Sequence, residues 1–200
     1  MNTSTKSILI LCALALALSA PARAEFADTE PGARGIALGG AFVAVDGDPA
    51  SVFWNPSAIL SERRVQVSGM RTRLFDGLDG VNVDFVGLTA RLGDRWGGGA
   101  GWTRLALEDV YTEDVITGAL AYRVSDQLQV GVSVLFFGAD APGLGPLADP
   151  SYTGARWETS GSLGVLYRWS DVLQFGASAE NLLRPKISLL GQDDDVDPIG

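Results

Sequence analysis

The sequence predicts an all-β fold, an antiparallel transmembrane β-barrel with a glycine-rich N-terminal plug and short helical turns. Three observations support this. After residue 63, segments of about ten residues alternate in polarity, as strands do. The connections between these segments alternate between short and long, and the side opposite the apolar side carries small residues. Loops sorted by length between the two ends of the strands are typical of outer-membrane barrels.

The first 24 residues predict a cleaved secretory signal peptide. Lys6 gives a positive start, residues 8–18 form an apolar core, and Ala22-Arg23-Ala24 is a cleavage site of the A-x-A kind. The alternative is an uncleaved membrane anchor. It is disfavoured because the apolar run is shorter than the ~20 residues that a helix needs to cross a bilayer. The predicted organisation is a signal peptide over 1–24, an N-terminal plug over 25–63 and barrel strands over 64–200.

Composition excludes several classes of function. The chain has no histidine, and its one cysteine, Cys12, lies in the signal peptide. The mature chain therefore lacks thiol catalysis, histidine acid–base chemistry and most zinc sites. It keeps 13 basic and 24 acidic residues, counted without Lys6 and Arg23, whereas nucleic-acid-binding proteins are usually basic. We expect no enzyme activity, no catalytic residue, no cofactor, no metal and no nucleic-acid partner.

Residues 32–60 stand apart because they combine glycines with small apolar residues. Gly35, Gly39 and Gly40 allow positive φ or close approach to another surface. This stretch is therefore expected to thread through a tight enclosure, as the plug of the barrel.

Two capping signals follow these glycines. Asp48 precedes Pro49 and Asn55 precedes Pro56, so each pair offers a side-chain acceptor at a helix N-cap and a proline at the first helical position. The sequence predicts short helical turns at about 49–54 and 56–60.

The strands that follow are predicted from period-two alternation. In the fifth, Leu128, Val130 and Val132 are expected on one side and Gln129 and Gly131 on the other. The sixth repeats this pattern. The apolar phase of the second changes near residues 85 and 86, which predicts a β-bulge. The predicted strands cover 64–75, 81–92, 96–107, 114–125, 128–138, 160–170 and 173–183.

The predicted connections are short at 93–95, 125–127 and 170–172, and longer at 76–80, 108–113 and 139–159. Short turns face the periplasm in outer-membrane barrels. Trp96, Tyr122 and Trp169 lie beside short turns in the apolar phase of their strands, so they are expected to form an aromatic girdle. The alternative is that they are core aromatics of a soluble β-sandwich.

The opposite phase carries glycine, alanine, serine and threonine, which predicts a barrel interior with room for the plug. Arg123 and Arg168 fall in this phase near the short turns. We expect them to hold the acidic pair Asp46 and Asp48, since a charge removed from water is best compensated by a direct partner. The alternative is solvated charges at a rim.

The order LGGAFVAVDGDPASVFWNPSAIL resembles the N-terminal signature of the FadL and PorV/PorQ group of Gram-negative outer-membrane β-barrels. In that group a glycine-rich segment precedes an acidic pair and an aromatic-Asn-Pro-small box. Here the box is Trp54, Asn55, Pro56 and Ser57, with serine where alanine is usual. Residues 178–188, SAENLLRPKIS, resemble the PorV/PorQ branch.

The resemblance implies a protein of the cell outer membrane that binds or passes hydrophobic molecules, with outer-membrane lipid and a hydrophobic small molecule as partners. Its PorV branch implies an alternative, an accessory of a type IX-like secretion system that docks cargo at the cell surface. A third reading from the residues is a soluble secreted β-domain that binds a ligand. Family members are about twice as long, and single-chain bacterial barrels have an even number of strands. We therefore expect 64–200 to be an incomplete barrel, although pairing of copies is an alternative.

Overall fold

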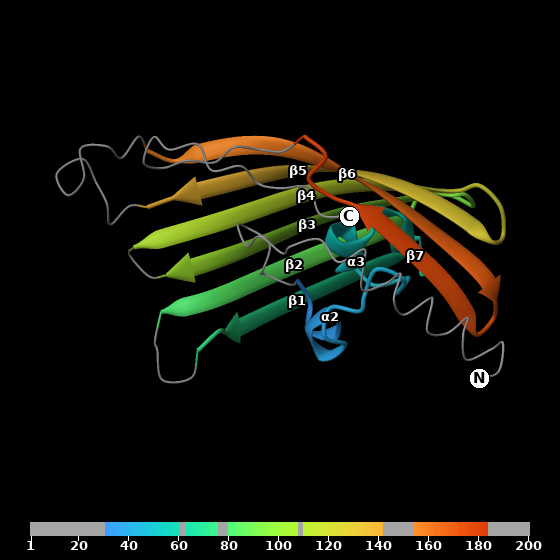
Figure 1. Ribbon diagram of the computed structural model, residues 1–200, viewed down its shortest axis with the longest axis horizontal. Coiled ribbons are helices and arrows are strands. Elements are labelled where there is room, and N and C mark those ends of the chain that lie inside the picture. The colour runs from blue at the N-terminus through green and yellow to red at the C-terminus, as the bar shows by residue number, and fades with distance from the viewer. Residues whose placement is uncertain (1–30, 61–62, 76–79, 108–109, 142–153, 184–200) are drawn as a thin grey trace, which may run out of the picture.

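The computed structural model describes residues 31–60, 63–75, 80–107, 110–141 and 154–183. The predicted signal peptide, residues 25–30 and residues 184–188 of the second resemblance lie outside these ranges, as does most of the connection before the sixth strand. The described residues form one antiparallel sheet that curls into a half-barrel (Figure 1). Each strand pairs with its neighbours along the chain, in the order β1 (Val65–Arg73), β2 (Val81–Arg91), β3 (Trp96–Leu107), β4 (Tyr111–Arg123), β5 (Leu128–Asp140), β6 (Arg156–Ser170) and β7 (Leu173–Ala179).

All seven predicted strands are confirmed, and the largest changes of boundary occur at three strand ends. β4 begins at Tyr111 and β6 at Arg156, both earlier than expected, and β7 ends at Ala179. The early start of β4 leaves only residues 108–110 between β3 and β4. The prediction of a long connection there was wrong, because Tyr111 to Glu113 continue the pairing with β3. The connections at 74–80 and 141–155 remain longer than those at the other end.

We call the end of the sheet with connections 92–95, 124–127 and 171–172 the turn end, and the opposite end the loop end. The two faces of the sheet are the predicted ones. In β5, Val132 and Val134 are exposed on the convex face, whereas Gln129 and Ser133 are buried on the concave face. The two sides of β6 alternate in the same way.

The bulge predicted in β2 is absent. Residues 81–91 pair without interruption with β3, and residues 82–90 pair likewise with β1. The apolar phase changes because the sheet is apolar on different faces in different zones. Val83 and Phe85 are buried on the concave face nearer the loop end, whereas Val86 and Leu88 are exposed on the convex face nearer the turn end. A register shift occurs instead between Arg168 and Ser170.

The convex face therefore has two zones. From the turn end to the middle it exposes large apolar side chains. Toward the loop end it carries ion pairs. Arg104 binds the Asp114 carboxylate through two nitrogens at 2.8 and 2.9 Å, and Trp102 Nε1 donates to the same carboxylate at 2.8 Å. The apolar zone includes Val67, Val86, Leu88, Ile116, Leu120, Val132, Val134, Leu163 and Val165.

Residues 31–60, the N-terminal segment, lie in the hollow of the curled sheet (Figure 1). The segment contains α2 (Ala33–Ala37), α3 (Ser51–Trp54) and the 3₁₀ turn η1 (Pro56–Ile59). The predicted turn at 56–60 is confirmed, with Asn55 as its N-cap. The turn at 49–54 becomes α-helical only at Ser51, although Asp48 Oδ1 accepts a hydrogen bond from the Ala50 amide at 2.9 Å.

The sequence did not predict α2, whose five residues follow Gly32 at a φ of 90°. None of the helices among the described residues is long and apolar enough to cross a membrane. After β7 the chain turns at Asn181, which has a φ of 53°. The Leu182 amide then donates to the Gly161 carbonyl at 3.0 Å.

Candidate functional site

The site is the contact between the N-terminal segment and the concave face. Glycines of three strands, β2, β5 and β7, let the segment's backbone touch the sheet. A Cβ at Gly131 would collide with the backbone of Pro56 and Ser57, and one at Gly176 would collide with the backbone at Val43. On β2, a Cβ at Gly87 would come within 2.9 Å of the Pro49 carbonyl oxygen. The small residues predicted on the inner face of the sheet thus make room for the backbone of the N-terminal segment.

Asn55 is the polar centre of this contact and is fully buried. Its Oδ1 accepts hydrogen bonds from the Ser57 amide at 3.0 Å and the Ser57 hydroxyl at 2.6 Å. Its Nδ2 donates to the Val43 carbonyl at 2.8 Å and, across to β6, to the Val165 carbonyl at 3.2 Å. A Cβ at Gly164 would clash with the Asn55 side chain. One amide therefore caps η1, fixes the preceding loop and binds the wall.

The Trp54 ring holds the first helix of the segment. Trp54 Nε1 donates to the Pro31 carbonyl at 3.0 Å, and the ring lies 5.8 Å from that of Phe42, centroid to centroid. Gly35 faces the same indole, where a Cβ would come within 2.9 Å. Close approach thus explains Gly35. Gly39 and Gly40 are explained by their positive φ angles of 61° and 79°. Phe42 in turn packs with Ala50 and Phe85 of the wall.

Polar side chains hold the segment at the turn end. Arg168 Nη2 donates to Asp46 Oδ2 at 2.7 Å, which is the ion pair expected between these two residues. Gln174 of β7 donates to the Ala44 carbonyl and, at 3.4 Å, to Asp46 Oδ1. The Asp46 and Arg168 side chains are 30% and 43% exposed, so solvent weakens the pair.

The second acid has a different partner. Asp48 Oδ2 lies 3.2 Å from Arg34 Nη1 within the N-terminal segment. Arg123 lies on the same concave face at the turn end of β4, with its Cα paired with that of Gln129. Its role in holding the segment stays a prediction.

The expected girdle residues all lie at the turn end of the sheet, but only two of them are in contact. Trp96 and Tyr122 are a cross-strand pair with ring centroids 4.7 Å apart. Trp169 lies 6.3 Å from Tyr167 on β6 and is exposed. Arg95, in the turn before β3, donates to the Tyr122 hydroxyl at 3.4 Å. This hydrogen bond raises the pKa of the Arg95 guanidinium above its usual value. An arginine side chain is cationic at physiological pH in any case.

Toward the loop end the concave face is apolar instead of bare. Val115, Leu135, Phe137 and Ala139 of β4 and β5 are buried together, and Phe53 of α3 packs against them. Tyr111 borders this cluster and donates to Glu113 Oε1 at 2.8 Å. The cluster gives this part of the concave face an apolar surface next to the N-terminal segment.

Sequence reasoning missed three residues that hold the segment. Gln174 carries a weak signal, since it is a lone amide in the small-residue phase of β7. Gln66 of β1 donates to the Gly47 carbonyl at 2.9 Å, and Arg34 pairs with Asp48. No pattern in the sequence identifies these two. Within the described ranges, no three His, Cys, Asp or Glu side chains gather as a metal site would require.

Comparison of the chain with models of protein families, with curated proteins and with solved structures finds no match in any of the three.

Proposed function

We propose that this chain is an outer-membrane β-barrel protein of the FadL and PorV/PorQ kind that binds or passes hydrophobic molecules and has no enzymatic activity. One observation carries the proposal. A continuous antiparallel sheet has large apolar side chains on its convex face, and small residues on its concave face contact the N-terminal segment. A soluble sandwich would instead cover its apolar face with a second sheet.

The dimensions support a strand that crosses a bilayer. β3 to β6 contain 12 to 15 residues, whereas a tilted transmembrane strand needs about 9–11. The extra length corresponds to the loop end, where Arg104 and Asp114 make the convex face polar. In the proposed orientation this end projects beyond the hydrocarbon, and the aromatic pair Trp96 and Tyr122 lies at the opposite interface.

Two features of the concave face support the proposal that apolar molecules pass through the barrel. The cluster of Val115, Leu135 and Phe137 lies beside Phe53, which belongs to the N-terminal segment. The segment is tied to β6 and β7 through Asp46, which contacts Arg168 and Gln174. In this proposal the segment is the plug, and its displacement opens the way from the apolar cluster to the turn end.

Membrane insertion is tested first. The full chain, expressed in a Gram-negative host, should sediment with outer membranes, and its folded form should migrate faster on gels before boiling than after. Recovery of a water-soluble monomer without detergent would refute the proposal and favour the soluble β-domain.

Ligand binding is tested with a fluorescent long-chain fatty acid. Val115→Asn puts an amide into the apolar cluster and should weaken binding about ten-fold, equivalent to about 1.4 kcal/mol. The matched control is Ile116→Asn, the next residue along β4, which faces the convex side and should leave binding unchanged. Gel migration confirms that each variant is folded. Equal binding by both variants would count against an interior site. The alternative function, a secretion accessory, would be favoured if deletion of the gene caused loss of surface proteins.

A further inference from the structure

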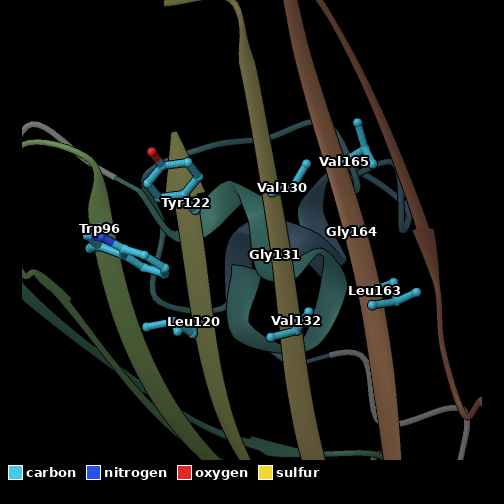
Figure 2. A pocket seen from close by; sticks show the side chains of 9 residues that line it. All are labelled: Trp96, Leu120, Tyr122, Val130, Gly131, Val132, Leu163, Gly164 and Val165. Carbon is cyan, nitrogen blue, oxygen red and sulfur yellow. The ribbon is translucent and has the colours of Figure 1, made fainter. Parts of the chain in front are cut away.

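A shallow groove runs along the convex face near the turn end (Figure 2). Trp96, Leu120 and Tyr122 form one side, Leu163 forms the other, and Val132 lies between them. The N-terminal segment is visible behind these strands in Figure 2, so the groove opens away from the site described above.

The register of the strands explains the groove. Leu120 of β4 is paired with Val132 of β5, which is paired with Leu163 of β6. One row closer to the turn end, Tyr122 is paired with Val130. Short valine side chains on β5 thus lie beside longer side chains in two successive rows. The trough they form follows the strands and has an apolar lining.

A cation lies at the turn end of this groove. Arg95 belongs to the turn that precedes β3, and its guanidinium donates to the Tyr122 hydroxyl at 3.4 Å. The Tyr122 ring itself lines the groove and lies against Trp96. Asp94, the neighbouring acid in this turn, pairs with Arg91 at 3.3 Å. Asp126 of the adjacent short turn also interacts electrostatically with Arg95. The hydrogen bond to the Tyr122 hydroxyl places the Arg95 guanidinium at the turn end of the apolar groove.

We infer that this groove binds one phospholipid, with an acyl chain between Tyr122 and Leu163 and the phosphate at Arg95. An apolar trough fits a hydrocarbon chain, and an arginine beside a hydroxyl matches phosphate oxygens, which accept charge-assisted hydrogen bonds. The apolar groove with the Arg95 cation at its end complements a molecule that joins an acyl chain to an anionic phosphate, and this combination selects the lipid as the occupant. The inference depends on the proposed function, since the convex face must meet lipid.

The experiment is native mass spectrometry of the full chain, folded in micelles and titrated with phosphatidylglycerol. The parent protein should retain one lipid. Arg95→Gln removes the phosphate contact and Val132→Trp fills the trough, so each should weaken binding at least five-fold. Diacylglycerol, which has the chains without the phosphate, should bind the parent protein at least five-fold more weakly.

Two variants serve as matched controls. Arg64→Gln removes an exposed arginine at the same end of the sheet, and Val67→Trp enlarges an exposed valine of the convex face on β1. Both should bind like the parent protein. Equal weakening in all four variants, or no retained lipid, would overturn the inference, as would a dimer that Val132→Trp dissociates. Heat-modifiable migration tests membrane folding separately, so a folded protein without the lipid contradicts only this inference.

Discussion

The two halves of the concave wall differ in what they present to the interior. Toward the turn end, the N-terminal segment lies with its backbone on Gly131 and Gly176 of the wall, and its Asn55 side chain lies on Gly164. Toward the loop end, Val115 of β4 and Leu135 of β5 belong to one buried apolar cluster. The size of each wall residue therefore reflects its neighbour. Close packing of backbone against the sheet requires glycines in the sheet, whereas apolar side chains of the segment pack against large apolar side chains of the sheet.

The largest expected effect comes from adding atoms to the bare half. Gly131→Val should cost more than about 3 kcal/mol, because its new side chain would meet the backbone of Pro56 and Ser57, which cannot rotate away. Urea unfolding in micelles measures the loss, and limited proteolysis should show new cleavage within 31–60. Gly118→Val is the control, since a Cβ there meets nothing within 4 Å. Equal stability of the two variants would contradict a close contact between Gly131 and the backbone of the N-terminal segment.

Removing the Asn55 side-chain amide should have the second largest effect. Asn55→Ala leaves the buried carbonyls of Val43 and Val165 without this donor, at a cost of about 3 kcal/mol in the free energy of unfolding. The same urea titration measures it. Asn82→Ala, on the half-buried convex side of β2, should cost less than about 0.5 kcal/mol. An Asn55 variant as stable as the Asn82 variant would contradict its central role.

In the apolar half of the wall, removing side-chain atoms should lower the stability, whereas in the glycine half adding atoms should lower it. Leu135→Ala should cost about 2 kcal/mol by leaving a cavity beside Val115 and Phe137. Protease sensitivity within 31–60 should stay near that of the parent protein, which distinguishes this variant from Gly131→Val. Release of the segment by Leu135→Ala would show that the two halves are not independent.

The smallest effect is expected at the ion pair. Arg168→Glu places two acids together and should cost about 1 kcal/mol, since both partners are partly exposed. Proteolysis within 31–60 should become faster, and the double variant Asp46→Arg with Arg168→Glu should restore part of the protection. Arg64→Glu, at the same end of the sheet, serves as the control. Unchanged cleavage in Arg168→Glu would refute the pairing as a restraint on the segment.

The sequence was sufficient for the strands and their faces because alternation is a local signal. Leu128 to Phe136 carry it without interruption, and the strand boundaries differ by a few residues only. The bulge near Phe85 was a wrong prediction for a related reason. Periodicity reports which side is apolar, and here the apolar side changes between zones although the strand stays regular.

The site was only partly predictable because its contacts join residues distant in the chain. The Asn-Pro pair predicted the N-cap of η1. The small residues that alternate with apolar ones along the strands predicted the face that contacts the N-terminal segment. Arg168 was expected as a partner of Asp46 and is one. The hydrogen bonds from Asn55 to Val165 and from Gln174 to Asp46 were not predicted, because they depend on how the sheet curls. Helix α2 has no capping side chain, and its neighbour, the Trp54 ring, follows it by many residues.

Each strand of the sheet pairs with its neighbour in the chain, so hairpins can assemble one after another from local contacts. The bonds from Asn55 to Val165 and from Asp46 to Arg168 instead span 110 and 122 residues. Residues 31–60 leave the ribosome before any strand, yet their seat exists only once β6 has joined the sheet. The first described part of the chain therefore takes its native contacts from strands that follow it by more than a hundred residues.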